Sequence, residues 1–150
     1  MKLLPFVLAA IIIWLLPLAS AFATEPPSSW TREWNKTDFS RSSIEFDEIR
    51  SGGPPKDGIP AIDRPEYRAP GEINNIGEQE PVITVTLNGE TRAYPVRILI
   101  WHEIANDTLG GVPITITFCP LCNSALVFGR RIDGQTFDFG TTGKLRNSGL

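Results

Sequence analysis

An alternating segment closed by a two-residue turn is the feature that most constrains the fold of this chain. Apolar residues alternate with threonine through residues 82–87, and Asn88 and Gly89 separate this run from residues 90–94. A period of two is typical of a half-buried strand, and an Asn-Gly pair supplies the left-handed backbone that a tight hairpin turn requires. The pattern predicts a β-hairpin over residues 82–94.

The segment that follows has a different period. Pro95 suits the start of a helix, and apolar side chains in residues 96–105 have the spacing of one buried helical face, formed by Ile98, Leu99, Trp101 and Ile104. We therefore expect one short helix that ends near Asn106 and Asp107.

Two further strand signals complete the fold prediction. The β-branched run at residues 112–118 predicts a buried strand that ends at Cys119, and Asp133 and Gly134 predict a second hairpin between residues 125–132 and 135–139. Two β-hairpins and one short helix indicate an α+β fold with a mainly antiparallel sheet.

The N-terminal residues have the composition of an export signal. Lys2 precedes an uncharged apolar run at residues 3–18, and Ala21 and Ala23 form a cleavage site of the A-x-A type. We expect a signal peptide at 1–23 and an exported protein, periplasmic or secreted, with an uncleaved membrane anchor as the alternative. No later apolar run reaches spanning length, which predicts no membrane contact after cleavage.

Between the signal and the hairpin, the sequence predicts few regular elements. Residues 24–50 are polar with scattered aromatic side chains, and residues 51–70 are rich in glycine and proline. We expect an extended arm at 24–50 that packs its aromatic residues on an α+β domain at 51–150.

Charge and motifs exclude several function classes. The 150 residues include 14 basic and 17 acidic side chains with no basic cluster, so nucleic acid is not an expected partner. Gly143 and Lys144 are followed by Leu145 rather than the Ser or Thr of a phosphate-binding loop, so no nucleotide is expected.

The two cysteines of the chain, Cys119 and Cys122, form a C-x-x-C motif at the end of the expected buried strand. A turn of this kind between strands resembles a zinc knuckle, and His102 is the single histidine that adds a third ligand. Soft thiolates favour copper or zinc. We therefore predict a metal site made of Cys119, Cys122 and His102, with four residues that orient the ligands or form the binding loop: Trp101, Glu103, Asp57 and Asp63.

Two other interpretations of the C-x-x-C motif stay open. In a thiol-disulfide oxidoreductase, Cys119 is the attacking thiol and Cys122 resolves the mixed disulfide, although the helix that usually stabilises such a thiolate is not predicted here. In a non-catalytic interaction domain, the pair forms a structural disulfide. Haem attachment is excluded, because Asn123 stands where that motif needs histidine.

Six separated motifs also carry a family resemblance. They are residues 52–63, 93–95, 101–104, 106–107, 110–113 and 119–122. Together they resemble an exported bacterial and archaeal family known as domain of unknown function 3179, over residues 51–150. The resemblance implies that the glycine-proline loop, Trp101, His102, Glu103 and the cysteine turn form one characteristic set. It also implies a C-terminally incomplete domain, since family members continue further.

Overall fold

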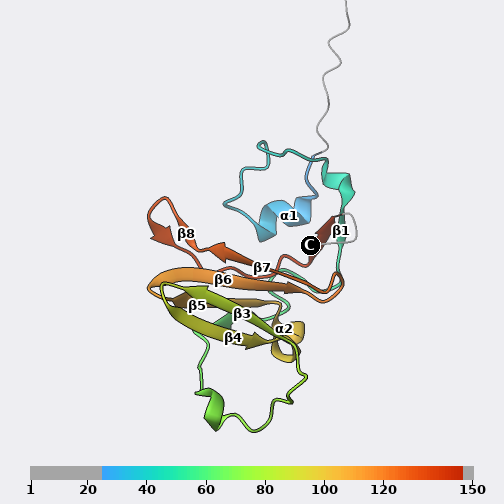
Figure 1. Ribbon diagram of the computed structural model, residues 1–150. Helices are drawn as coiled ribbons and strands as arrows, with labels where there is room; N and C mark the ends of the chain where they lie inside the picture. The colour runs from blue at the N-terminus through green and yellow to red at the C-terminus, as the bar shows by residue number, and fades with distance from the viewer. Residues whose placement is uncertain (1–24, 147–150) are drawn as a thin grey trace, which may run out of the picture.

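The computed structural model describes residues 25–146, and the signal-peptide prediction at 1–23 lies outside these residues. A four-stranded sheet occupies the middle of the molecule, in the order β2-β5-β6-β7 (Figure 1). Its strands are β2 (Ile62–Asp63), β5 (Ile104–Leu109), β6 (Val112–Cys119) and β7 (Ser124–Gly129). Only the β2–β5 pair is parallel. The α+β prediction is confirmed.

The predicted first hairpin is present, with β3 (Val82–Leu87) antiparallel to β4 (Glu90–Pro95). Asn88 and Gly89 both have positive φ, as the turn requires. The hairpin and helix α2 (Val96–His102) lie on one side of the sheet (Figure 1). The core between them contains Tyr94, Leu99 and Ile116, so burial of apolar area fastens the hairpin to the sheet.

Helix α2 is shorter than the sequence pattern predicts. Glu103 has a left-handed backbone with φ 58° and ends the helix, so Ile104 belongs to β5 rather than to a helical face. Leu99 is the one buried residue of α2, whereas Trp101 is 76 % exposed. The extended form of β5 is stabilised by its full pairing with β6, a tertiary interaction that outweighs local helical spacing.

Residues 104–109 therefore form an additional hairpin with β6 that the sequence pattern did not predict. Gly110 and Gly111 turn the chain with φ of 56° and 77°. The predicted strand at 112–118 is confirmed by β6, which contains the buried Ile114, Ile116 and Phe118.

The second predicted hairpin forms in a reduced version. Strand β7 ends at Gly129, and only β8 (Arg131–Ile132) and β9 (Gln135–Thr136) pair around the Asp133 turn. Arg130 interrupts the strand, since its side chain is buried and bonded to several carbonyl groups. Within residues 25–146, β7 is an edge strand whose six residues are all exposed.

The N-terminal segment contains short elements instead of a wholly extended arm. Helix α1 (Ser28–Glu33) and a 3-10 turn (Phe46–Glu48) bring Trp30, Trp34, Phe39 and Phe46 into edge-to-face contacts. A further 3-10 turn, Pro70–Glu72, lies in the loop that leads to β3. These aromatic contacts form locally, because their residues are close in the chain.

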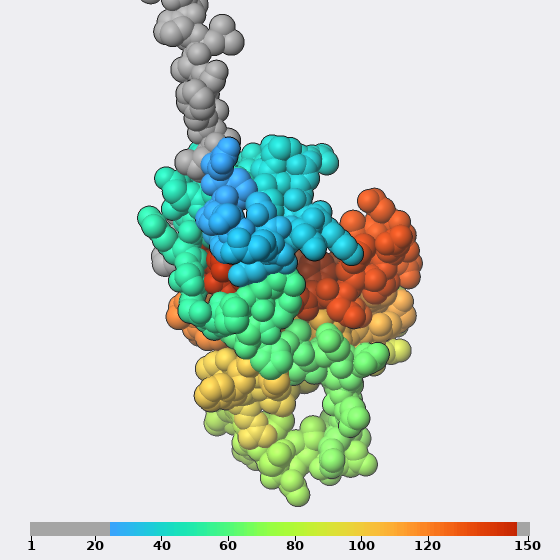
Figure 2. Space-filling view, turned by 180° about the vertical axis from the view of Figure 1, so that it is seen from behind, coloured from blue at the N-terminus to red at the C-terminus, as the bar shows by residue number. Residues whose placement is uncertain are grey.

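The N-terminal segment and the C-terminal end of the described chain meet in a small ladder. Strand β1 (Ile49–Ser51) pairs antiparallel with β10 (Lys144–Arg146). Figure 2 shows the N-terminal segment and the following loop lying over the red C-terminal segment. Among residues 25–146, no helix has the length and apolar character needed to cross a membrane.

Candidate functional site

An apolar cavity of about 430 Å³ lies beside the cysteine turn. Both sulfur-bearing residues line it, together with Leu126 and Phe128 of β7 on one side and the segment 140–145 on another. We call it the cysteine cavity. It contains few polar groups, so its most distinctive chemistry comes from the thiols and from the charged Glu103 and Lys144.

The two thiols differ in exposure. Cys119, at the end of β6, is 7 % exposed, whereas Cys122 is exposed in the turn between β6 and β7. Their Sγ atoms are 2.9 Å apart, with Cys119 placed to donate to the Cys122 sulfur. The Cys122 N–H donates to the Cys119 sulfur at 3.3 Å. A disulfide needs a sulfur separation of about 2.05 Å, so a small movement is sufficient to join the pair.

The turn geometry explains why the thiols converge. Cys119 and Ser124 are opposite one another in the β6–β7 register, which leaves Pro120, Leu121, Cys122 and Asn123 to reverse the chain. Asn123 takes a positive φ of 47°. Asparagine tolerates this left-handed backbone better than most residues, so the tight turn carries little strain.

Glu103 brings an unusual carboxyl group to the cavity. Burial raises the pKa of Glu103 above its ordinary value. Its left-handed backbone lies between α2 and β5, and its carbonyl accepts a hydrogen bond from Phe118 N–H at 2.7 Å. The Glu103 side chain is thus positioned by the end of a helix and by the strand that carries Cys119.

The glycine-proline loop supports the opposite wall of the cavity. Gly52 N–H donates to the Gly143 carbonyl at 2.9 Å, and Asp57 N–H donates to the Thr141 carbonyl at 2.8 Å. Gly143 has φ 64°, and a Cβ there would collide with the Pro54 carbonyl. Only glycine fits this close approach of two backbones, so the loop acts as a clamp on segment 140–145.

The other predicted site residues are not among those that line the cysteine cavity. The His102 Nδ1 atom is 2.8 Å from the Pro60 carbonyl, and Trp101 projects into solvent. Asp57 pairs with Lys56, and Asp63 accepts a hydrogen bond from the Asn106 side chain. In residues 25–146, no group of three or more His, Cys, Asp or Glu side chains is arranged to hold a metal ion.

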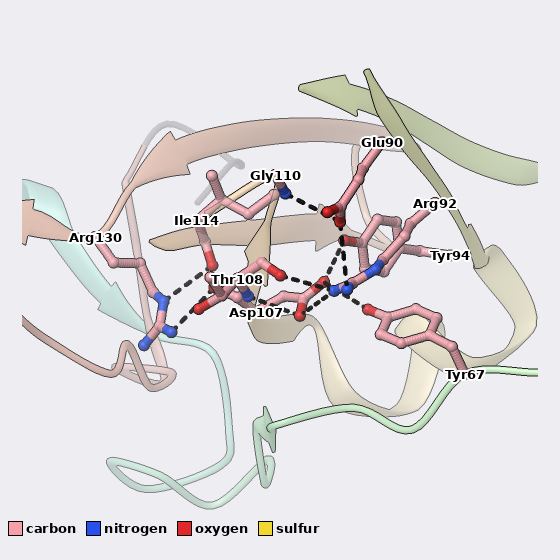
Figure 3. Close-up of polar contacts among 9 residues, drawn as sticks. All are labelled: Tyr67, Glu90, Arg92, Tyr94, Asp107, Thr108, Gly110, Ile114 and Arg130. Carbon is pink, nitrogen blue, oxygen red and sulfur yellow. Dashed lines mark hydrogen bonds and ion pairs between the residues drawn. The ribbon is translucent and has the colours of Figure 1, made fainter. Parts of the chain in front are cut away.

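A second candidate site, which is polar, lies around Asp107 on β5 (Figure 3). Its carboxylate accepts hydrogen bonds from Arg92 at 2.6 Å, from the hydroxyls of Tyr67 and Tyr94 at 2.7 Å each, and from Thr108 N–H at 2.7 Å. We call these five residues the Asp107 network. Asp107 is buried, so the network replaces the water that an ionised carboxylate would otherwise bind.

The pKa of Asp107 is lowered in this network, whereas the pKa values of Tyr94 and Tyr67 are raised. Burial acts to raise the pKa of Asp107, but hydrogen bonds from Arg92, Tyr94, Tyr67 and Thr108 outweigh it and lower that pKa below its ordinary value. Burial, with the hydrogen bond to Asp107, raises the pKa of Tyr94 to about 12. Burial also raises the pKa of Tyr67, followed by its hydrogen bonds to Tyr94 and Asp107.

Arg130 and Asn106 extend this polar region. Arg130 donates to the carbonyls of Ile114, Phe137 and Asp107 and pairs with Asp138 (Figure 3 shows it opposite Arg92). The Asn106 side chain binds both the N–H and the carbonyl of Phe139. Arg130 and Asn106 were not assigned to a site from the sequence. The sequence feature that could have indicated them is a polar side chain within or directly beside a strand-like apolar run.

The fold and site define an α+β domain that combines a hydrogen-bonded polar interior with a paired-cysteine cavity. Residues 56–150 match the model of a family described as "Protein of unknown function (DUF3179)". The chain belongs to this family, which confirms the resemblance. No curated protein and no solved structure matched the chain.

Proposed function

We propose that the cysteine cavity is the site of a thiol-disulfide oxidoreductase that acts on disulfides presented by an apolar surface. The observation that carries this proposal is the 2.9 Å approach of one buried and one exposed thiol at the edge of an apolar cavity. An exposed thiol is accessible to a substrate, and a close second thiol resolves the intermediate. The export signal proposed for residues 1–23 is compatible with disulfide substrates.

We propose the two thiol roles in the reverse order to the sequence prediction, because Cys122 is exposed and Cys119 is buried. Cys122 as thiolate attacks one sulfur of the substrate disulfide, forms a mixed disulfide and releases the other substrate sulfur as a thiolate. Cys119 as thiolate then attacks the Cys122 sulfur and releases the remaining substrate thiolate. The protein dithiol loses two electrons and becomes a disulfide, and the substrate disulfide becomes two thiols.

Glu103 is the candidate proton acceptor for the second step. Glu103 lines the cavity together with Cys119, and burial raises its pKa above the ordinary value, which makes its carboxylate a stronger base. Lys144 is the cationic residue of the opposite wall, with its Nζ atom 5.5 Å from the centre of the Trp34 ring.

The test uses the symmetric aromatic disulfide 5,5′-dithiobis(2-nitrobenzoate) on the reduced protein. The unsubstituted protein is expected to release two equivalents of chromophore and to end with an internal disulfide, lower in mass by two hydrogens. Cys119→Ser is expected to release one equivalent and to keep a stable adduct on Cys122. Cys122→Ser is expected to react many-fold more slowly, because its remaining thiol is buried.

Two results would refute the oxidoreductase. One is an unsubstituted protein that keeps a single adduct without forming the internal disulfide. The other is a Cys122→Ser variant that reacts as fast as Cys119→Ser. Glu103→Gln serves as the mechanistic control, since loss of the acceptor should shift the pH profile of the second release while leaving the first unchanged.

Binding of a soft metal by the two thiolates is the second candidate. The observation in its favour is the cysteine turn between two strands, the arrangement of a zinc knuckle. Two thiolates on tetrahedral zinc lie about 3.8 Å apart, so the sulfurs would have to separate from 2.9 Å. Copper(I) or zinc mass retained by the native protein and lost in Cys119→Ser would support this candidate over the oxidoreductase.

A further inference from the structure

A small hollow of about 230 Å³ lies next to the Asp107 network, at the far end of the sheet from the cysteines. Asp107 is paired with Ile114 in the β5–β6 register, and Cys119 lies five residues further along β6. At a rise of about 3.3 Å per residue, the two sites are about 17 Å apart. The hollow is therefore separate from the cysteine cavity.

Three arginines line this hollow, on three different segments. Arg64 follows β2, Arg92 lies on β4 and Arg130 follows β7. Asn106, Thr108 and Tyr67 add polar groups to the wall. Three guanidinium groups from distant parts of the chain lie at one hollow because β2 and the β4 hairpin both pack on β5.

The donors of these arginines are only partly used. An arginine has five N–H donors. Four donors of Arg130 are bonded, which leaves one on Nη2. The hydrogen bonds of Arg92 all come from Nη1, and its Nη2 lies 3.8 Å from Glu90. Within the described part of the chain, the Arg64 side chain makes no hydrogen bond or ion pair, so all its donors remain.

The position of Arg64 is set by its backbone. Arg64 has φ 57°, and its N–H donates to the Asn106 carbonyl at 3.1 Å. A left-handed arginine is uncommon, because its Cβ crowds the following carbonyl oxygen. Arg64 thus keeps a strained backbone beside the hollow, and among the described residues its guanidinium group forms no ion pair.

The charge balance in the wall is positive. Asp107 is the single carboxylate among the lining residues, against three guanidinium groups. Asp138 is ion-paired with Arg130, and Glu90 lies 3.8 Å from the Arg92 Nη2 atom, so within the described residues Arg64 is the guanidinium of this wall without a carboxylate partner. Asp63 is held by the Asn106 amide on the adjoining strand.

We propose that the hollow between Arg64, Arg92 and Arg130 binds a small oxoanion, a carboxylate or phosphate group. Guanidinium groups match both anions through paired N–H donors, and the size of the hollow suits one such group with water. Arg64 provides the uncommitted charge, whereas Arg92 and Arg130 are oriented in advance by Asp107 and by the carbonyls they bind.

Titration calorimetry at low ionic strength tests this site with inorganic phosphate and, separately, with succinate. The expected result is saturable binding of at least one anion that weakens at least tenfold in Arg64→Gln. Arg32→Gln is the matched control, because it removes the same charge from an exposed position on α1. Phosphate binding alone assigns a tetrahedral anion, succinate binding alone assigns a carboxylate, and binding of both assigns the shared chemistry.

Three results would overturn the proposal. They are the absence of saturable binding of either anion, equal binding by Arg64→Gln and the unsubstituted protein, and an equal loss of binding in Arg32→Gln. The Arg64 variant is expected to keep the unfolding midpoint of the unsubstituted protein, since its side chain has no described partner. The thiol assays should be unaffected, which separates this test from that of the oxidoreductase.

Discussion

The two ends of strands β5 and β6 show opposite ways of arranging polar chemistry. Around Asp107, a buried carboxylate accepts hydrogen bonds from four residues, among them both tyrosine hydroxyls. Around Cys119, the wall is largely apolar, and polar groups such as Glu103 line an open cavity. The first region is held by hydrogen bonds among its own residues beside a small hollow of about 230 Å³, and the second is a larger apolar cavity of about 430 Å³.

This difference indicates how stability and reactivity are divided in the domain. A satisfied buried network is costly to disturb, because each lost partner leaves donors without water. An open apolar cavity tolerates changes at its edge, but it places the exposed thiol of Cys122 beside space for a substrate. We therefore expect substitutions at the Asp107 network to affect folding and substitutions at the cavity to affect chemistry.

The largest effect is expected from Asp107→Ala. This change leaves the Arg92 charge and two tyrosine hydroxyls without their acceptor, and breaking a buried ion pair typically costs about 3–5 kcal/mol. Urea unfolding followed by circular dichroism measures the loss. Glu48→Ala is the control, since its pair with Arg146 is exposed at both ends and should contribute less than about 1 kcal/mol. Equal losses in the two variants would contradict the comparison.

The next largest effect is expected from Gly143→Ala. A methyl group there meets the Pro54 carbonyl, and the backbone has φ 64°. We expect a loss of about 2–3 kcal/mol from strain and displacement of the clamp. Gly111→Ala has φ 77° with no atom within 4 Å of the added carbon, so it isolates the backbone contribution of about 1–2 kcal/mol. Thermal unfolding compares the two variants. Equal decreases in their unfolding midpoints would contradict the clamp, because the close approach to Pro54 would then add nothing to the backbone cost.

The dependence of stability on pH should come mainly from the Asp107 network. The folded pKa of Asp107 is lowered, so its contribution is present above the unfolded pKa of about 3.9 and is lost as pH falls through the folded pKa. The folded pKa of Tyr94 is raised to about 12, so its contribution is present below the unfolded value of about 10 and is lost as pH rises toward 12. Each group changes stability by at most about 1.4 kcal/mol per pH unit.

Unfolding midpoints measured across pH check both limbs. Asp107→Asn is expected to flatten the acid limb, and Tyr94→Phe is expected to flatten the alkaline limb. An acid limb that keeps its slope in Asp107→Asn would assign acid unfolding to other carboxylates.

The smallest effect on stability is expected from Leu126→Ser at the wall of the cysteine cavity. Its side chain is 61 % exposed, and substitutions at such positions usually change stability by less than about 0.5 kcal/mol. If the cavity receives the apolar part of a disulfide substrate, the rate of the first thiol exchange should nevertheless fall. Two outcomes would contradict this separation of stability from reactivity. One is that Leu126→Ser unfolds the protein, and the other is that the variant exchanges with apolar disulfides at an unchanged rate.

Local signals predicted the elements that need few distant partners. The Asn88 turn specifies its hairpin, because left-handed backbone and alternating side chains occur within neighbouring residues. The end of α2 was predicted too late, since the left-handed Glu103 and the pairing of β5 with β6 depend on tertiary contacts. The polar residues Asn106 and Asp107 resembled a helix end, yet their buried partners stabilise a strand.

The candidate site also combines a feature set by neighbouring residues with features set by tertiary contacts. The cysteine pair is recognisable from the sequence, and its two sulfurs do converge. The histidine expected beside them instead binds the Pro60 carbonyl. Tyr67 and Asp107 are 40 positions apart in the chain, so no spacing rule links them before the hairpin packs on β5.

The sequence by itself determined the α+β class, the family, the first hairpin and the cysteine turn, because these depend on periodicity, turn chemistry and motifs among near neighbours. Only the tertiary structure decided which thiol is exposed, where the cavity lies and which charges meet at Asp107 and Arg64. Those properties depend on contacts between segments far apart in the chain, and burial sets both the reactivity of a thiol and the ionisation of a carboxylate.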